Sequence, residues 1–408
     1  MKLEKVLTYQ KGRSPQKDFV SDNLILYLTP EYLRGNGSPN FISDFPSKVH
    51  VENGDLLLLW DGSNAGEFFK GRKGFLSSTM VKFKFDEVEY QREFLYYQLK
   101  AFEGYLKAQT NGSGIPHVDR ELLLGIEVEK FEKLEQNRIA QILSKADTAI
   151  AQTEALIAKY QRIKTGLMQD LLTKGIDEHG NIRSKATHRF VMKNGIEVPE
   201  EWEVIRLKDC VTPGTTITYG IVQTGLHRPD GVQVLRTIDL KEDYIDGSNL
   251  LRTSPEISNL FKRTILKEGD LVCNVRASVG DFNIVPKELE GVNTTRGVAR
   301  ISPKKEINNR YMLWFLKSET NKRQMELLIK GTTFIDINIA DLREIFVCIP
   351  KDRIEQDKIA FNLESILNKI NKAKLNFHKL QSLKTGLMQD LLSGKVRVNV
   401  NQKLDTSN

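Results

Sequence analysis

Apolar residues recur at alternating steps of four and three positions in two stretches of the chain, the spacing of one face of a coiled-coil helix. No proline interrupts either stretch, so each is predicted to form one long amphipathic helix. The two predicted faces carry Ile139, Leu143, Ala146, Ile150, Thr153, Ile157 and Tyr160, and Ile359, Leu363, Ile366, Ile370, Ala373, Phe377 and Leu380. The next apolar residues, Ile163 and Leu383, follow after three positions in both stretches, which predicts an irregular step at the same place.

The two stretches belong to an internal duplication. The nonapeptide KTGLMQDLL stands at 164–172 and again at 384–392. The same offset of 220 positions aligns the whole of 134–172 with 354–392 without a gap. A helix with a single apolar stripe needs a partner to cover it, and the nearest candidate is the duplicate in the same chain. A coiled coil that only joins two copies of the chain remains the alternative.

A segment with mixed strand and turn signals precedes each predicted helix. GDLLLLWDGSNAG (54–66) resembles GDLVCNVRASVG (269–280), and both indicate a strand entered through a Gly-Asp turn. The apolar runs LLLGIEVE (122–129) and LREIFVCIP (342–350) predict a strand that leads into each helix. Between these landmarks the two segments diverge. The chain is therefore predicted to alternate a variable domain with a helix, twice.

The domain boundaries follow from these landmarks. The connector between the first helix and the second variable domain is polar and rich in glycine, and it is predicted to be an extended loop. The predicted parts are a first variable domain at 1–133, a first helix at 134–172, a linker at 173–200, a second variable domain at 201–353, a second helix at 354–392 and a flexible tail at 393–408.

Composition excludes several classes of protein. No apolar run of the 408 residues approaches the ~20 needed to span a bilayer, and the amino-terminal residues turn polar too soon for a secretory signal peptide. The three cysteines show no metal-ligand spacing, which suits a reducing cytoplasm. The net charge of +7 is not concentrated in either variable domain. Charge alone therefore gives only weak support for nucleic-acid binding.

Catalytic motifs are missing from the sequence. There is no GxxxxGK[ST] phosphate loop, no GxGxxG turn and no Asn-Pro-Pro-Tyr motif for methylation of an amino group. A nuclease-like pattern can be assembled from Pro229-Asp230 and Asp239-Leu240-Lys241, but Pro-Asp-Gly is an ordinary turn signature. The histidines form no metal-binding pair, and Cys273 and Cys348 stand in apolar strands. We expect no catalytic or metal-binding residue in this chain.

DNA reading requires donors and acceptors on loops, with basic residues nearby for the phosphates. Loops around the matched landmarks supply such residues in both variable domains, although solvated turns have the same composition. The candidates are Ser63, Asn64, Lys70, Arg72, Lys73, Gln109, Asn111 and Ser113 in the first domain, and Arg276, Ser278, Asn293, Thr294, Thr295, Arg296, Lys330, Thr332 and Thr333 in the second. Arg276 and Arg296 are the strongest candidates, because arginine can hold guanine through two hydrogen bonds.

The chain resembles the specificity subunits of type I restriction–modification systems over essentially its whole length. The resemblance rests on KTGLMQDLL at the end of each helix, on EQNRIA (135–140) with its echo EQDKIA (355–360), and on PEEWEV.RL at 199–207. One departure is the short amino terminus, which lacks the PEEWEV lead-in of the second domain.

The resemblance implies an α/β (α+β) fold with two pseudo-repeated target-recognition domains separated by two long helices that pack as an antiparallel coiled coil. Each domain would read one half of a split target in double-stranded DNA, and the helices would set the spacing. Two modification subunits would supply S-adenosylmethionine-dependent adenine methylation. Restriction subunits would cleave DNA with ATP and magnesium. The chain itself would need no cofactor, would contact no membrane and would lie in the cytoplasm.

For the helices, the resemblance implies contacts with each other and with the modification subunits. The residues expected there are Ile139, Leu143, Ile150, Ile157, Leu167, Met168, Ile359, Leu363, Ile370, Phe377, Leu387 and Met388. Two other functions remain open from the residues alone. A free-standing regulator with two DNA-binding domains would need a helix-turn-helix or a ligand domain, which the sequence does not suggest. A coiled-coil scaffold without a DNA role would bind independently of salt and sequence.

Overall fold

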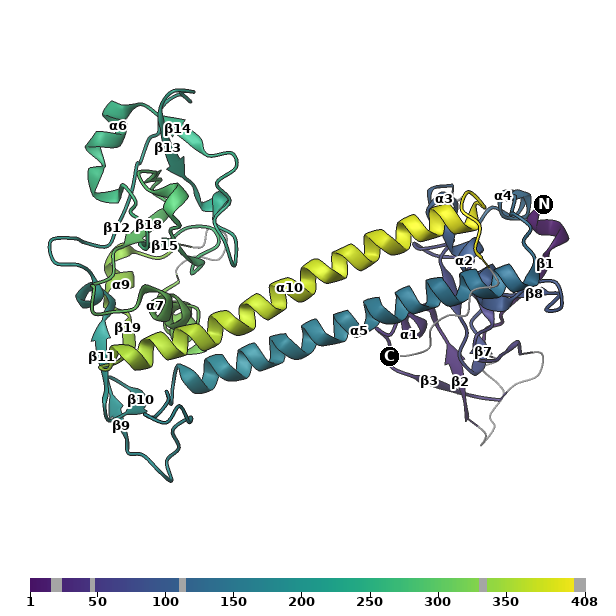
Figure 1. The fold of residues 1–408 in the computed structure, drawn as a ribbon, viewed down its shortest axis with the longest axis horizontal. Helices are drawn as coiled ribbons and strands as arrows, with labels where there is room; N and C mark the ends of the chain where they lie inside the picture. The colour runs from purple at the N-terminus through teal and green to yellow at the C-terminus, as the bar shows by residue number, and fades with distance from the viewer. Residues whose placement is uncertain (16–23, 45–47, 110–114, 330–335, 400–408) are drawn as a thin grey trace. The chain divides into compact units, whose positions relative to one another are not determined.

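The computed structural model divides the chain into two compact units. Unit 1 comprises Met1–Ala155 and Lys374–Asn408, and unit 2 comprises Leu156–Ala373. The structure describes residues 1–15, 24–44, 48–109, 115–329 and 336–399. Two long helices, α5 (Lys133–Leu171) and α10 (Arg353–Leu392), each contribute to both units (Figure 1). Their bounds agree with the two helices predicted from the apolar stripe to within one residue.

Two sheets form the body of unit 1. The strands are β1 (Leu7–Lys11), β2 (Leu24–Leu28), β3 (Asn40–Ser43), β4 (His50–Val51), β5 (Leu56–Leu59), β6 (Phe68–Lys70), β7 (Gly74–Leu76) and β8 (Met80–Phe85). The first sheet has the order β1-β8-β5-β6 with every neighbouring pair antiparallel. The second has the order β3-β2-β7-β4, in which β2 and β7 are parallel. All four residues of β5 are buried, because this strand lies in the middle of its sheet with apolar layers on both faces.

Unit 2 repeats the order of the first sheet and of strands β3, β2 and β7 in the second. The strands of its two corresponding sheets are β12 (Thr218–Tyr219), β13 (Val232–Leu235), β14 (Leu251–Thr253), β15 (Leu271–Asn274), β16 (Phe282–Ile284), β17 (Asn293–Thr294) and β18 (Val298–Ile301). One sheet has the order β12-β18-β15-β16 and the other β14-β13-β17, again with a single parallel pair, between β13 and β17. The two variable domains therefore share a fold, although their sequences match only at a few landmarks.

Three short helices follow the sheets in each unit. They are α2 (Arg92–Ala101), α3 (Glu103–Ala108) and α4 (Arg120–Gly125) in unit 1, and α7 (Asn309–Leu316), α8 (Glu319–Leu328) and α9 (Ile339–Glu344) in unit 2. Polar side chains cap their amino-terminal N–H groups: Asp119 accepts from the first turn of α4 and Asn308 from that of α7. The aromatic side chains of Phe94 and Tyr97 on α2 and of Tyr311 on α7 are completely buried.

Short elements complete the two units. Unit 1 also contains η1 (Leu3–Lys5) and α1 (Pro30–Leu33), and unit 2 contains η2 (Leu207–Cys210), η3 (Thr237–Asp239), α6 (Pro255–Leu260), η4 (Lys262–Thr264) and η5 (Lys287–Leu289). The PEEWEV lead-in forms β11 (Trp202–Arg206), which pairs with β19 (Phe346–Pro350) over five residues. In unit 1 a single bridge between Lys2 and Glu127 occupies the corresponding place.

Three predictions about the connecting segments are wrong. The linker 173–200 is not an extended loop throughout, because β9 (Phe190–Lys193) and β10 (Ile196–Pro199) form a hairpin around Asn194 and Gly195, both at positive φ. The run 122–129 does not form a strand, since Asp119 caps helix α4 at its start. The first part of the tail, 393–399, is held against α5, and the remainder lies outside the described residues.

The two long helices pack against each other in opposite directions within each unit (Figure 1). In unit 1, Ile139 and Leu143 near the start of α5 share a cluster with Leu391 near the end of α10. In unit 2, Leu171 at the end of α5 shares a cluster with Ile359 near the start of α10. These contacts agree with the expected antiparallel arrangement at both ends. A coiled coil along the full length stays a prediction.

The predicted irregular step is wrong. Ile163 and Leu383 are 39% and 56% exposed, whereas Lys164 and Lys384 are partly buried on the apolar stripe. The partly buried stripe therefore continues with a regular step of four in both helices, and a lysine occupies the next position on it. A long lysine side chain can cover apolar surface with its methylene groups while its ammonium remains accessible, so the burial pattern does not require an apolar residue there.

The glutamine of the repeated Glu-Gln pair at the start of each helix connects that helix to the preceding domain. Gln136 donates to the carbonyls of Glu89 and Phe131 and accepts from the N–H of Gln91 at 2.7 Å. Gln356 makes the equivalent contacts in unit 2, donating to the carbonyl of Pro350 and accepting from Asn308 at 2.7 Å. These equivalent contacts explain why the glutamine recurs at the offset of 220 positions.

Candidate nucleic-acid interface

Arg276 and Arg296 lie at the same end of the β15–β18 pair in unit 2. The register pairs Asn274 with Val298, and the next backbone hydrogen bond joins the N–H of Val275 to the carbonyl of Gly297 at 2.9 Å. Arg276 is the neighbour of Val275, and Arg296 is the neighbour of Gly297, at this end of the strand pair; both side chains are exposed. The two arginines are twenty positions apart in sequence but form one basic surface. We name this surface, with Ala277, Ser278 and Thr295, the unit 2 tip.

Backbone conformation at this tip is unusual. Ala277 adopts φ 62°, a left-handed conformation that costs a residue with a Cβ about 1 kcal/mol or more. The bridge between Arg276 and Asp336 and the hydrogen bond from the N–H of Ile337 to the carbonyl of Val275 hold the loop in place. Such constraint is common where a loop presents side chains to a ligand.

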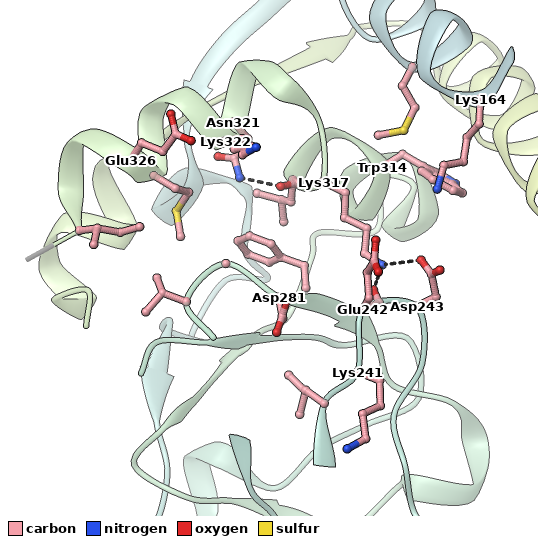
Figure 2. A pocket seen from close by; sticks show the side chains of 18 residues that line it. Lys164, Lys241, Glu242, Asp243, Asp281, Trp314, Lys317, Asn321, Lys322 and Glu326 are labelled. Carbon is pink, nitrogen blue, oxygen red and sulfur yellow. Dashed lines mark hydrogen bonds and ion pairs between the residues drawn. The ribbon is translucent and has the colours of Figure 1, made fainter. Parts of the chain in front are cut away.

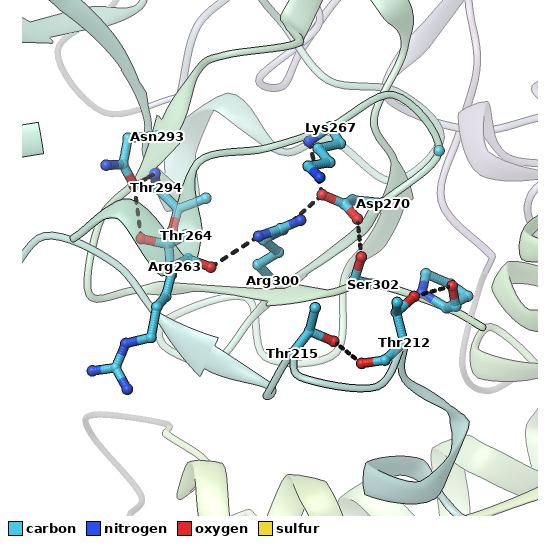
Figure 3. Close-up of polar contacts among 12 residues, drawn as sticks. Thr212, Thr215, Arg263, Thr264, Lys267, Asp270, Asn293, Thr294, Arg300 and Ser302 are labelled. Atoms are coloured by element: carbon cyan, nitrogen blue, oxygen red, sulfur yellow. Dashed lines mark hydrogen bonds and ion pairs between the residues drawn. The ribbon is translucent and has the colours of Figure 1, made fainter. Parts of the chain in front are cut away.

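A buried ion pair anchors the strands behind the unit 2 tip (Figure 3). The guanidinium of Arg300 donates to Asp270 at 2.6 Å and to the carbonyl of Arg263 at 2.9 Å, and Ser302 donates to the other carboxylate oxygen. In unit 1, Lys82 pairs with Asp55 at 2.5 Å in the matching strands. The Gly-Asp landmark of both domains therefore serves a structural purpose, because its carboxylate fixes a basic residue of the neighbouring strand.

Two predicted DNA-reading residues of the second domain are wrong. Asn293 and Thr294 are completely buried. The amide of Asn293 donates to the hydroxyl of Ser258 at 3.0 Å and accepts from Thr264 at 2.7 Å, as Figure 3 shows for Thr264. Asn293 therefore holds strand β17 to α6 and η4, and neither buried side chain can reach DNA in the folded domain. Thr295 is partly exposed, and Ser278 is exposed.

In unit 1, Ser63 and Asn64 are exposed in the loop that follows β5. This loop begins at Asp61, whose carboxylate pairs with Lys11 at 2.8 Å, and it lies at the end of the β5–β8 pair. A hollow of about 600 Å³ adjoins it, lined by Lys11, Gly12, Arg13, Ser14, Asp61, Gly62, Ser78, Thr79 and Ile115. We name these residues, with Ser63 and Asn64, the unit 1 tip.

Most members of the unit 1 tip are absent from the sequence candidates. Lys11, Arg13 and Ser14 lie at the end of β1, which has no landmark in common with the second domain. Asp61 is a carboxylate, so it is not among the amide, hydroxyl and basic side chains expected to contact DNA. A usable signal is Gly12: a Cβ at this position would lie 2.0 Å from the carbonyl of Ser77, so only glycine allows the close approach.

Lys70, Arg72 and Lys73 do not belong to the unit 1 tip. Strand β6 runs antiparallel to β5, which carries these residues to the opposite end of the hairpin from Asp61. The ammonium of Lys70 pairs with Glu93 and lies 4.6 Å from the ring centroid of Tyr96. Arg72 and Lys73 are exposed, so they can still contact a phosphate, but they do not extend the surface formed by Ser63 and Asn64.

The remaining candidates lie beside the tips in sequence. Gln109 is exposed at the end of α3. The carbonyl of Pro116 accepts from the N–H of Gly62 in the unit 1 tip at 2.9 Å. Five candidates fall outside the described residues: Asn111, Ser113, Lys330, Thr332 and Thr333.

The two copies of the nonapeptide have different surroundings. In unit 1, Lys384 pairs with Asp147 at 2.5 Å, and the same carboxylate accepts from the hydroxyl of Tyr97. In unit 2, Lys164 lines a pocket of about 630 Å³ with Trp314 and Lys317 (Figure 2). Burial lowers the pKa of Lys317, and its neighbour Asp243 partly offsets that effect. The identical peptide therefore does not create identical sites.

The residues expected on the helices fall into two groups. Ile139, Leu143, Ile359, Leu363 and Ile370 are fully buried. The others are partly buried: Ile150, Ile157, Leu167, Met168, Phe377, Leu387 and Met388. Leu167 and Met168 pack against the large core of unit 2, and Leu387 and Met388 against the helix cluster of unit 1.

Four other apolar residues of the long helices face solvent at matched positions. Leu134 and Ile354, which are 71% and 62% exposed, occupy equivalent places at the two helix starts. Ile163 and Leu383 occupy equivalent places in the last third of each helix. Exposed apolar residues that recur together at both copies of a repeat indicate a contact surface that is itself duplicated.

The cysteines are core residues. Cys210, Cys273 and Cys348 are buried and free, and burial raises the pKa of the Cys210 and Cys348 thiols to about 12. No helix among the described residues is both long enough and apolar enough to span a bilayer. Within that same part of the chain, no group of three or more histidine, cysteine or acidic side chains gathers as a metal site would require.

Comparison with known proteins identifies the family. A type I restriction modification DNA specificity domain matches residues 1–162 and again residues 199–377. The chain is 32% identical over 405 residues to the type I restriction enzyme MjaVIII specificity subunit of Methanocaldococcus jannaschii, covering 96% of this chain and 91% of that protein. It is 22% identical to the EcoBI specificity subunit of Escherichia coli, covering 92% of this chain and 80% of that protein. The chain belongs to the family of type I restriction–modification specificity subunits.

Solved structures share the fold. The S subunit of a type I restriction–modification system from M. genitalium superimposes with a TM-score of 0.61 at 17% identity, over 96% of this chain and 95% of that one. A chain from a study of complex assembly and conformational transition in the type I R-M system gives a TM-score of 0.56 at 18% identity, over 97% of both chains. The predicted fold class, with two related recognition domains and long helices, is confirmed.

Proposed function

We propose that this chain is the noncatalytic DNA reader of a larger complex, in which each unit tip reads one half of a split target in double-stranded DNA. The observation that carries the proposal is the repetition of one fold with two different tips. At the same end of the matching strand pair, unit 2 has Arg276 and Arg296, whereas unit 1 has Asp61 and Ser78. A repeated scaffold with divergent surface side chains suits a protein that reads two unlike half-sites.

The long helices dock two copies of one modification subunit. The support is the matched exposure of Leu134 with Ile354 and of Ile163 with Leu383. A partner that recognises one member of each pair would recognise the other in the same way, which gives two copies for one chain. The modification subunits supply adenine methylation with S-adenosylmethionine. Restriction subunits join to cleave DNA with ATP and magnesium, and the complex acts in the cytoplasm.

Subunit stoichiometry tests the docking. Ile354→Asp alone should leave one modification subunit bound, and Leu134→Asp with Ile354→Asp should leave none, as measured by native mass spectrometry of the co-expressed complex. Leu260→Asp is the matched control, because this leucine is 80% exposed on α6, away from the two long helices. Two bound modification subunits in the double variant would contradict the assignment of the surface.

DNA reading is tested by sequencing the methylome of cells with and without the gene for this chain. We expect methylation at one bipartite motif that depends on the chain. Methylation that persists without it, or that never acquires a motif with it, would contradict the reading function.

A further inference from the structure

The tips of the two units are built on equivalent backbone. Gly62 follows β5 with φ 121°, and Ala277 follows β15 with φ 62°, so a left-handed residue stands at the same place in both. Asp61 bridges to His117 as Arg276 bridges to Asp336. A glycine without space for a Cβ directly follows the corresponding strand, β1 or β12, in each unit: Gly12 in unit 1, and Gly220 in unit 2, where the nearest carbonyl oxygen would lie 1.9 Å from a Cβ.

This equivalence places Asp61 at the position of Arg276. In both units the residue is the second after its strand, and its predecessor donates to the strand opposite: Trp60 to Thr79 at 2.8 Å, and Val275 to Gly297 at 2.9 Å. The main arginine candidate of unit 2 is thus replaced in unit 1 by a carboxylate. An exposed arginine offers only donors, and a carboxylate offers only acceptors.

The surroundings make a carboxylate tolerable near DNA. Lys11 pairs with Asp61 at 2.8 Å and is half exposed, and Arg13 is exposed in the same hollow. These cations offset the repulsion between the carboxylate and DNA phosphates, and either can contact a phosphate directly. The side chain of Asp61 remains 29% exposed although it pairs with Lys11, and Asp61 lines the hollow.

In the major groove, a carboxylate can accept only from the exocyclic amino group of cytosine or adenine. We propose that Asp61 is a specificity-determining residue of unit 1 and accepts a hydrogen bond from such an amino group in the half-site that unit 2 does not read. The inference rests on the proposed function, because it requires that the unit 1 tip meets DNA. It assigns opposite hydrogen-bonding chemistry to the two halves of the target.

The test compares methylomes written by the full complex containing wild-type chain, Asp61→Ala, Asp61→Asn or Arg276→Ala. Asp61→Ala should reduce discrimination at one position of one half-site by between about five- and 100-fold. That half-site must be the one that Arg276→Ala leaves unchanged. Asp61→Asn should keep an adenine at this position, or shift a cytosine toward adenine, because an amide pairs with adenine through two hydrogen bonds.

Glu4→Ala is the control for charge, since Glu4 is an exposed acid of unit 1 outside the tip. It should leave the motif unchanged. An unchanged motif in both Asp61 variants would overturn the inference, as would relaxation of the half-site that Arg276→Ala also relaxes. Co-purification with the modification subunit shows that each variant folds. If the wild-type complex writes no bipartite motif, the proposed function itself fails, and the two failures are therefore distinguishable.

Discussion

Arg397 and Glu135 form a bidentate ion pair at the start of α5 in unit 1, although they are 262 positions apart in the chain. The guanidinium Nε donates to Oε1 at 2.9 Å, and the same carboxylate accepts from the N–H of Val398. In unit 2, Arg183 holds Glu355 in the same way, with Ile176 donating its N–H at 3.0 Å. The segment that follows each long helix therefore closes on the start of the other.

The two ion pairs are expected to contribute unequally to the free energy of unfolding. Arg183→Ala should lower the free energy of unfolding by about 3–5 kcal/mol, because both side chains are less than 10% exposed and Glu355 would be left buried without a cation. Arg397→Ala should cost about 1.5–3 kcal/mol, since Arg397 is largely exposed and water can replace part of its contact. Urea unfolding followed by tryptophan fluorescence measures both values.

A surface pair provides the control for these two variants. Arg189 and Glu200 are 75% and 52% exposed, so Arg189→Ala should change stability by less than about 1 kcal/mol. Equal losses in all three variants would show that the Glu-Arg pairs contribute no more than ordinary surface charges.

Arg276→Ala should weaken specific binding by about 1–3 kcal/mol and relax one position of one half-site. The other half-site should be unaffected, because unit 1 has its own tip. Binding to target duplexes substituted at single positions measures both effects. Unchanged affinity and an unchanged motif would make Arg276 a surface charge without a reading role.

The buried thiols should be unreactive in the folded chain. With the pKa of Cys210 and Cys348 raised to about 12, both remain protonated at pH 8, and Cys273 is completely buried. A thiol-specific reagent should therefore label no cysteine in native protein at pH 8 and three after denaturation. Rapid labelling of Cys348 in the native chain would contradict its place in the core.

Purified alone, the chain should neither methylate nor cleave DNA. The reason is the absence of nucleotide-binding and methyltransferase motifs from its sequence. Incubation of the isolated chain with DNA and labelled S-adenosylmethionine, and separately with ATP and magnesium, measures this. Label transferred to DNA by the chain alone would contradict the assignment of methylation to a partner subunit.

Lengthening both long helices should lengthen the unspecified spacer of the target. One heptad inserted after Thr153 and one after Ala373, matched positions that are both buried, adds ~10.5 Å to each helix and keeps the apolar stripe in phase. At ~3.4 Å per base pair this corresponds to about three base pairs. The outer letters of the methylated motif should stay the same, with activity reduced by the roughly 100° rotation of the groove.

Methylome sequencing distinguishes the outcomes of that insertion. An original spacer written by the lengthened chain would show that the helices do not set the spacing. A single heptad inserted in α5 alone is the control, and it should abolish assembly because the two stripes no longer match.

The sequence by itself determined the two long helices and their duplication. A heptad stripe is a local and periodic signal, so Ile139 and Ile359 identify their helices without knowledge of anything distant. The Gly-Asp landmarks also located β5 and β15. Arg276 and Arg296 could be selected from their chemistry alone, although nothing in the sequence placed them side by side.

Only the tertiary structure decided which side chains share a tip. Sheet pairing joins strands that are far apart in the chain, and many apolar sequences satisfy the same pairing. The two domains therefore share a fold although few of their residues are identical. Arg183 and Arg397 show the same limit, because they stand 214 rather than 220 positions apart and escape an alignment at the repeat offset. Asp61 and Arg276 occupy one structural position with opposite charge, since the backbone fixes the place and leaves the exposed side chain free to differ.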